Sequence, residues 1–171
     1  MKEQLIYQAV EQALKEVKKA APVMTLAMAK KLAGEVEHKA EEMGAAVVIA
    51  VTDKAARPVA IHCMDDAYIA SFDIALNKAY TSAGLKMSTA RLSELSGPGQ
   101  PLYGIQNTNH GQIVIFGGGE ALEIDGRMVG ALGVSGGTLE QDTYLAAYGR
   151  EMFEQSCRNA AIKERDDKQW Q

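Results

Sequence analysis

Residues 114–138 have the sequence VIFGGGEALEIDGRMVGALGVSGGT, and this stretch decides the fold. Asp125-Gly126 lies between two apolar runs, and the dipeptide favours a two-residue hairpin turn because that turn needs a positive φ at both central residues. The stretch therefore predicts two antiparallel strands around the turn. Glycines at 117–119 and 136–137 let the backbone bend or approach another group closely. None of these glycines can act as a nucleophile, an acid or a metal ligand, so the stretch predicts fold rather than function.

The composition of the 171-residue chain is ordinary for a globular protein, with 47% hydrophobic and 23% charged residues. This length suits one domain with a short appendage. A formal net charge of −4 argues against a nucleic-acid partner, which needs a clustered basic face. No apolar run approaches the roughly 20 residues that span a bilayer, and the N-terminus lacks the apolar core of a signal peptide. We therefore expect a cytoplasmic protein with no nucleic-acid or membrane partner.

The first part of the chain, residues 1–22, predicts an amphipathic helix followed by a linker. Within about residues 3–18, apolar positions recur at spacings of three and four and fall on one helical face: Ile6, Ala9, Val10, Ala13, Leu14 and Val17. Pro22 ends the pattern because a proline pushes the preceding residue out of the helical region. One domain at 23–160 and a charged tail at 161–171 complete the predicted organisation.

The patterning of the domain predicts an α+β fold. Five strands are expected at about 46–52, 59–63, 112–116, 121–124 and 127–134, where apolar and β-branched runs lie between turn signals. Helices are expected at about 25–44, 67–83, 88–95 and 138–160. Asp65-Asp66 is expected to cap the second of these helices, and Thr138 with Gln141 has the spacing of a capping box. These elements predict a five-stranded antiparallel sheet with flanking helices on one face.

Several short motifs within residues 24–157 occur in the order and spacing of a known family: Val51-Thr52-Asp53, Met64-Asp65, Lys78-Ala79-Tyr80-Thr81, Gly117-Gly118-Gly119, Gly133-Val134-Ser135-Gly136-Gly137-Thr138 and Gln141-Asp142. On these motifs the chain resembles the GlcG and HbpS family, which includes the C-terminal domain of PduO proteins. The resemblance implies a profilin-like α+β fold, homo-oligomers built from dimers, and haem as a cofactor in some members, occasionally with haem degradation. It implies no settled enzymatic activity.

The chain also departs from the family pattern. The turn that usually carries paired glycines has the residues Lys54-Ala55-Ala56-Arg57-Pro58, and Cys63 stands where an arginine often precedes the Met-Asp pair. The adenosyltransferase domain of full-length PduO proteins has no counterpart here. We therefore expect a stand-alone module and do not expect corrinoid adenosylation.

His38 is the best candidate for a haem-iron ligand, because neutral imidazole commonly binds iron. In the predicted helix it lies about 180° from the mean direction of the apolar stripe, so it is expected to point away from the core. In some PduO-type relatives, a histidine on the first helix of the domain looks like the iron ligand. The alternative is an ordinary solvated histidine among four glutamates, namely Glu35, Glu37, Glu41 and Glu42.

The other histidine, cysteine and methionine side chains are weaker candidates for a metal or haem ligand. His62 and Cys63 are adjacent on a predicted strand and so point to opposite faces, which prevents them from binding one metal together. Cys63 and Met64 are typical packing residues at the end of a strand. His110 lies in a polar loop whose asparagines and glycine are explained by turn chemistry. Cys63 and Cys157 have no metal-type spacing and are expected to be reduced thiols.

A catalytic alternative uses Asp65, Asp66 and Lys78. Adjacent carboxylates shift each other's pKa and could serve acid–base chemistry, although helix capping explains the same pair. Lys78 could neutralise a carboxylate or a haem propionate, or could be an ordinary exposed helical lysine. The glycines before Thr138 open a helix whose N–H groups could bind an anion, but the P-loop lysine and the dinucleotide-binding pattern are absent from the sequence.

The predicted N-terminal helix allows one further partner. A short amphipathic helix on a linker resembles the encapsulation peptides that bring cargo into bacterial microcompartments, so residues 1–18 could bind a shell protein and place the chain in the microcompartment lumen. The alternative is packing on the chain's own domain or on a dimer mate. Three functions therefore stay open: a haem-binding accessory protein, an enzyme acting on a small metabolite or haem, and a purely structural oligomeric scaffold.

Overall fold

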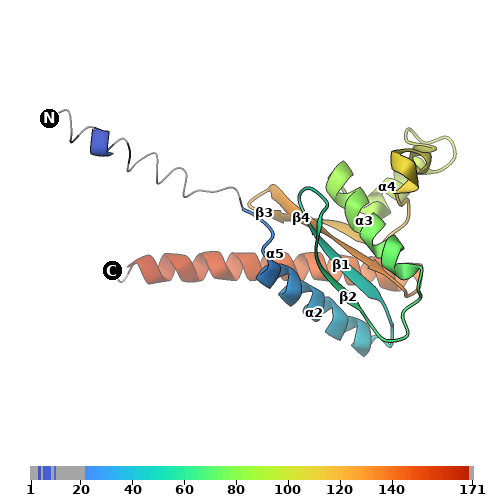
Figure 1. Ribbon diagram of the computed structural model, residues 1–171, viewed down its shortest axis with the longest axis horizontal. Helices are drawn as coiled ribbons and strands as arrows, with labels where there is room; N and C mark the ends of the chain where they lie inside the picture. Colours follow the sequence, from blue (N-terminus) through green and yellow to red (C-terminus); the bar gives the residue numbers. More distant parts are fainter. Residues whose placement is uncertain (1–3, 5, 9, 11–21, 170–171) are drawn as a thin grey trace.

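An antiparallel sheet of four strands runs through the middle of the protein (Figure 1). The computed structural model describes residues 4, 6–8, 10 and 22–169. The sheet has the order β2-β1-β4-β3, and its strands are β1 (Val48–Asp53), β2 (Pro58–Cys63), β3 (Gly119–Ile124) and β4 (Arg127–Ser135). Asp125 and Gly126 have φ values of 50° and 70°, so the predicted β3–β4 hairpin is confirmed. Two hairpins thus meet along the central β1–β4 pair.

Helices cover both faces of this sheet. They are α2 (Leu26–Glu42), α3 (Ser71–Leu85), α4 (Thr89–Ser96) and α5 (Leu139–Gln169), with 3₁₀ turns η1 (Ile105–Asn107) and η2 (Asn109–Gly111). Helices α2 and α5 pack side by side on one face and α3 lies on the other (Figure 1). The prediction of helices on a single face is therefore wrong. β1 explains why, since Ile49 and Val51 belong to the core under α2 and α5 whereas Val48 and Ala50 pack with Ala75 of α3.

Glycine in β4 lets α3 lie directly against the sheet. A Cβ built on Gly133 would lie 2.0 Å from the carbonyl oxygen of Ala75 and 2.8 Å from the amide nitrogen of Ala79. No side chain can occupy that space, so the backbone of α3 packs on the backbone of β4. Alanine on the facing side of α3 completes this close contact, with Ala75 and Ala79 fully buried.

The predicted fifth strand at 112–116 is not a strand in the described part of the chain. The amide of Val114 donates to Thr81 Oγ1 of α3 at 2.9 Å, and the amide of Gly119 donates to Thr89 Oγ1 of α4, also at 2.9 Å. Within 112–116, the Thr81 hydroxyl therefore satisfies a backbone donor, the amide of Val114, that a strand would pair with a neighbour. The segment is bonded to Thr81 of α3 and the chain enters the sheet only at β3, so the antiparallel sheet has four strands and not five.

Two helix boundaries differ from the prediction. α3 begins at Ser71 after Ala70, which makes no side-chain capping bond, so the expected cap at Asp65-Asp66 is wrong. Asp66 instead occupies a turn with a φ of 66°. α5 continues beyond the expected end at about 160 to Gln169, because residues 161–169 include neither glycine nor proline to stop it.

The predicted N-terminal cap of α2 is confirmed. Thr25 Oγ1 accepts from the amide of Met28 at 3.2 Å and caps α2. Most of the predicted N-terminal helix at 3–18 lies outside the described residues. Those described there are helical and exposed: residues 4, 6–8 and 10.

Candidate functional site

His38 lies on the solvent side of α2, as its position in the helical period predicts. Its side chain is 75% exposed. Its Nδ1 lies 3.6 Å from Glu41 Oε2 and its Nε2 lies 3.5 Å from Glu42 Oε1. A carboxylate beside one ring nitrogen can orient an imidazole while the other nitrogen binds a metal. The His38 imidazole is therefore accessible, with carboxylates on the next turn of its own helix.

Gly34 leaves an open strip beside His38. It lies one helical turn before the histidine on the same face, and a Cβ built on it would meet nothing within 4 Å. Glycine inside a helix costs about 0.5–1 kcal/mol relative to alanine, so neither helix propensity nor packing within the described residues requires it here. Its lack of a side chain does allow a flat group to approach α2 closely next to the imidazole.

Lys78 is fully buried, in contrast to the exposed helical lysine that was expected as the default. Its Nζ donates to Asp142 Oδ2 and to the carbonyl oxygen of Val134, both at 2.7 Å. The ring of Phe116 lies 5.0 Å from Nζ, measured to the ring centroid, within the range of a cation–π contact. Burial lowers the pKa of Lys78, and the Asp142 carboxylate opposes this change. The ammonium group is thus held by the fold and has no exposed surface.

The start of α5 satisfies its own backbone donors. Asp142 Oδ1 accepts from the amide of Gly137 at 2.9 Å. Thr138 and Gln141 form the predicted capping box, in which each side chain accepts from the other residue's amide at 3.2 and 2.9 Å. The amides of Gly137 and Thr138 are therefore not free to hold an anion, which argues against the anion-binding alternative at Gly136-Gly137-Thr138.

A hollow of about 350 Å³ lies beside this helix start. Its wall is formed by residues from the start of α3, the segment before β3 and the start of α5: Tyr68, Ala70, Ser71, Ile74, Phe116, Ser135, Gly136, Gly137, Leu139 and Asp142. Tyr68 and Leu139 are 73% and 52% exposed. Asp66 borders the adjoining hollow, whereas Asp65 lines neither. This hollow could not be predicted from the sequence, because its wall is assembled from residues far apart in the chain.

The predicted site residues do not form one centre. His38 lies on α2 and Lys78 on α3, and these helices cover opposite faces of the sheet (Figure 1). Asp65 and Asp66 are exposed in the turn after β2. Among the described residues, no group of three histidine, cysteine or acidic side chains is placed to hold a metal ion.

The remaining candidates also lie apart. His62 Nδ1 contacts Glu37 Oε2, and Cys63 is exposed at the end of β2. His110 is exposed in η2 with a left-handed φ of 57°. Of the two free thiols, Cys157 is the more buried, and burial raises its pKa.

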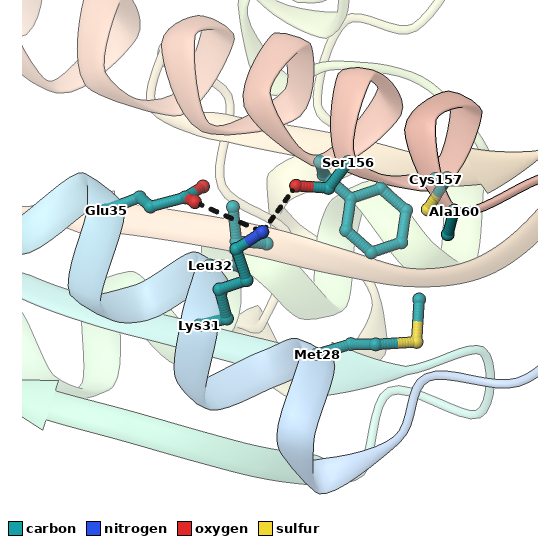
Figure 2. Close-up of a pocket in the computed structure, with 8 residues that line it drawn as sticks. Met28, Lys31, Leu32, Glu35, Ser156, Cys157 and Ala160 are labelled. Atoms are coloured by element: carbon teal, nitrogen blue, oxygen red, sulfur yellow. Dashed lines mark hydrogen bonds and ion pairs between the residues drawn. The ribbon is translucent and has the colours of Figure 1, made fainter. Parts of the chain in front are cut away.

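An apolar groove, missed by the sequence reasoning, lies between α2 and α5 (Figure 2). It has a volume of about 250 Å³. Its lining residues come from the first turns of α2 and the middle of α5: Met28, Lys31, Leu32, Glu35, Phe153, Ser156, Cys157 and Ala160. Lys31 Nζ donates to Ser156 Oγ at 2.9 Å and lies 3.7 Å from Glu35 Oε1, so the polar groups of the groove partner one another.

Residues 24–151 match the family model described as haem degrading protein HbpS-like. The chain belongs to the HbpS-like family. Among its relatives, a 15.0 kDa protein encoded between dhaT and dhaS in Citrobacter freundii is 47% identical over 130 residues, which are 76% of this HbpS-like chain and 92% of that protein. The corrinoid adenosyltransferase PduO of Salmonella typhimurium is 38% identical over 109 residues, which are 64% of this chain and only 32% of PduO.

Solved structures share the HbpS-like fold. The Klebsiella pneumoniae protein ORFY is 44% identical with a TM-score of 0.74, and the match covers 79% of this chain and 94% of that one. A PduOC:haem complex is 32% identical with a TM-score of 0.73 over 76% of this chain and 94% of that one. HbpS, at 24% identity and a TM-score of 0.70 over 78% and 92%, shows the same fold. No helix in the described part of this chain has the length and apolar character needed to cross a membrane.

Proposed function

We propose that this protein is a haem-binding accessory protein and that His38 binds the iron. The observation that carries the proposal is the 32% identity to a PduO C-terminal domain whose crystal structure is a haem complex, together with the exposed imidazole of His38 on α2. Bound haem would supply a redox-active iron to the protein.

The residues around His38 are suited to contact one face of a haem group. The imidazole is accessible, its neighbouring glutamates can orient the ring, and the open strip at Gly34 accepts a planar partner. Glutamates rather than apolar residues dominate this face of α2: Glu35, Glu41 and Glu42. The apolar cover that haem needs is therefore proposed to come from a second copy of the chain, which agrees with the expected homo-oligomer built from dimers.

The catalytic alternative has weaker support. Lys78 has no exposed surface and its ammonium already binds Asp142 and Val134, so a substrate would have to displace an internal ion pair. Asp65 and Asp66 are exposed in a turn, where carboxylates are well solvated. We therefore favour binding over catalysis. Targeting to a microcompartment through residues 1–18 stays a prediction, because most of that segment lies outside the described residues.

Haem titration of the purified, tag-free protein tests the proposal, with the Soret band followed for the wild type, His38→Ala and His110→Ala. His110 is the matched control because it is also an exposed histidine, in η2 and not on α2. We expect a saturable shift in the wild type and in His110→Ala that His38→Ala loses. No shift in the wild type would favour a purely structural scaffold over a haem-binding protein. An unchanged shift in His38→Ala would mean that another residue binds the iron.

A further inference from the structure

The groove between α2 and α5 is shaped for side chains rather than for a cofactor. Its volume of about 250 Å³ lies below the range of about 300–1,000 Å³ typical of small-molecule pockets. Met28, Leu32, Phe153 and Cys157 give it apolar walls, and Lys31 turns its ammonium to Ser156 at one side (Figure 2). Nothing in the groove calls for a polar ligand, whereas apolar knobs from a helix would fill it.

The same chain carries an apolar stripe that has no cover in the described structure. Ile6 and Val10 are 62% and 51% exposed, and both are helical. They lie one turn apart and therefore share a face, which the sequence extends through Ala13, Leu14 and Val17. A stripe of this kind becomes stable in water only when it is buried against a second apolar surface.

The connection between the stripe and the groove has the right length. Residues 19–25 join the predicted helix to α2, and a linker of this size lies within the 2–8 residues that usually connect packed helices. Pro22 prevents one continuous helix. Met24 is 7% exposed, and Met28, four residues later, lines the groove, so the linker ends beside the groove.

We propose that residues 3–18 fold back as an amphipathic helix and dock in the groove between α2 and α5 of the same chain. Attachment through a short linker gives the segment a high effective concentration at the groove, which favours this occupant over a separate partner. Docking gives the domain a third helix on the α2–α5 face and covers the side of Cys157 that lines the groove. The inference does not depend on haem binding.

The rate at which the Cys157 thiol reacts with a maleimide tests the docking in the full-length chain. Cys63→Ser removes the exposed second thiol and serves as the background. Ile6→Asp with Val10→Asp places charges on the apolar stripe, and Gln4→Asp with Gln8→Asp places the same charges at the same spacing on the opposite face. Since Cys157 lines the groove, a docked helix shields it and an undocked one does not.

We expect the background protein and the Gln4/Gln8 variant to react about tenfold more slowly than the Ile6/Val10 variant, independently of protein concentration. Equal rates in all three would overturn the proposal. Protection that grows with protein concentration would assign the groove to the segment of a second copy and so overturn docking within one chain. Protection that appears only when a microcompartment shell protein is added would overturn it in favour of targeting.

Discussion

Lys78 Nζ lies 2.7 Å from Asp142 Oδ2, and this ion pair joins α3 on one face of the sheet to α5 on the other. The side chains are 0% and 7% exposed. Asp142 also binds the amide of Gly137, and Lys78 also binds the carbonyl of Val134, so the pair fixes the end of β4 and the start of α5 together. Lys78, which the sequence analysis offers as a catalytic candidate, here organises the fold together with Asp142.

Lys78→Met should lower the free energy of unfolding by about 3–5 kcal/mol, because it leaves the Asp142 carboxylate buried without its cation. Urea unfolding at neutral pH measures the loss. Lys78→Met combined with Asp142→Leu removes both charges and should cost less than the two single changes added together. A double variant that costs the full sum would mean that the two side chains do not stabilise each other.

The same lysine should make stability depend on pH in the alkaline range. Burial lowers the pKa of Lys78 below its ordinary value of 10.5. Between that lowered pKa and 10.5 the unfolded chain binds more protons than the folded one, so the free energy of unfolding rises with pH. The difference between the wild type and Lys78→Met, measured by urea unfolding from neutral pH to about pH 10, should therefore increase. A flat or falling difference would contradict the lowered pKa.

Two glycine-to-alanine changes should have opposite signs. A methyl group on Gly133 would meet the Ala75 carbonyl oxygen at 2.0 Å and push α3 off the sheet, which should cost about 1–3 kcal/mol or more. Gly84 lies in α3 with nothing within 4 Å, so Gly84→Ala should stabilise the protein by about 0.5–1 kcal/mol. Thermal unfolding compares the two, and equal effects would contradict the direct contact between α3 and β4.

Gly34→Leu should weaken haem binding by about tenfold if the proposed site uses the open strip beside His38, because the added side chain occupies that strip. Gly84→Leu is the matched control, since it adds the same side chain to another open helical glycine. The Soret titration described above measures both. Unchanged affinity in Gly34→Leu would place haem away from this part of α2 even if the protein binds it.

Local signals predicted local structure well. Asp125-Gly126 makes the hairpin, Thr25 caps α2, and Thr138 forms its capping box, because each depends on residues within four positions. The outward direction of His38 also follows from the helical period alone. These features are fixed by neighbours in the chain and can be read before the fold is known.

Features that depend on distant partners could not be predicted in this way. The burial of Lys78 is set by Asp142, which is 64 residues away. The absence of a strand at 112–116 reflects the hydroxyl of Thr81 on another element. The apolar run of β1 is compatible with cover on one face or on two, and only the placement of α3 decides between them.

The central seam of the sheet pairs Val48 of β1 with Ser135 of β4. A ribosome releases β1 long before β4, so until β4 is made β1 has β2 as its partner in the sheet and its other edge is unpaired. The seam closes once nearly the whole domain has been synthesised, and contacts this far apart in sequence slow the search for the native topology. Newborn copies of this chain therefore pass through an interval in which the backbone groups on the β4 edge of β1 are unpaired and open to another nascent chain.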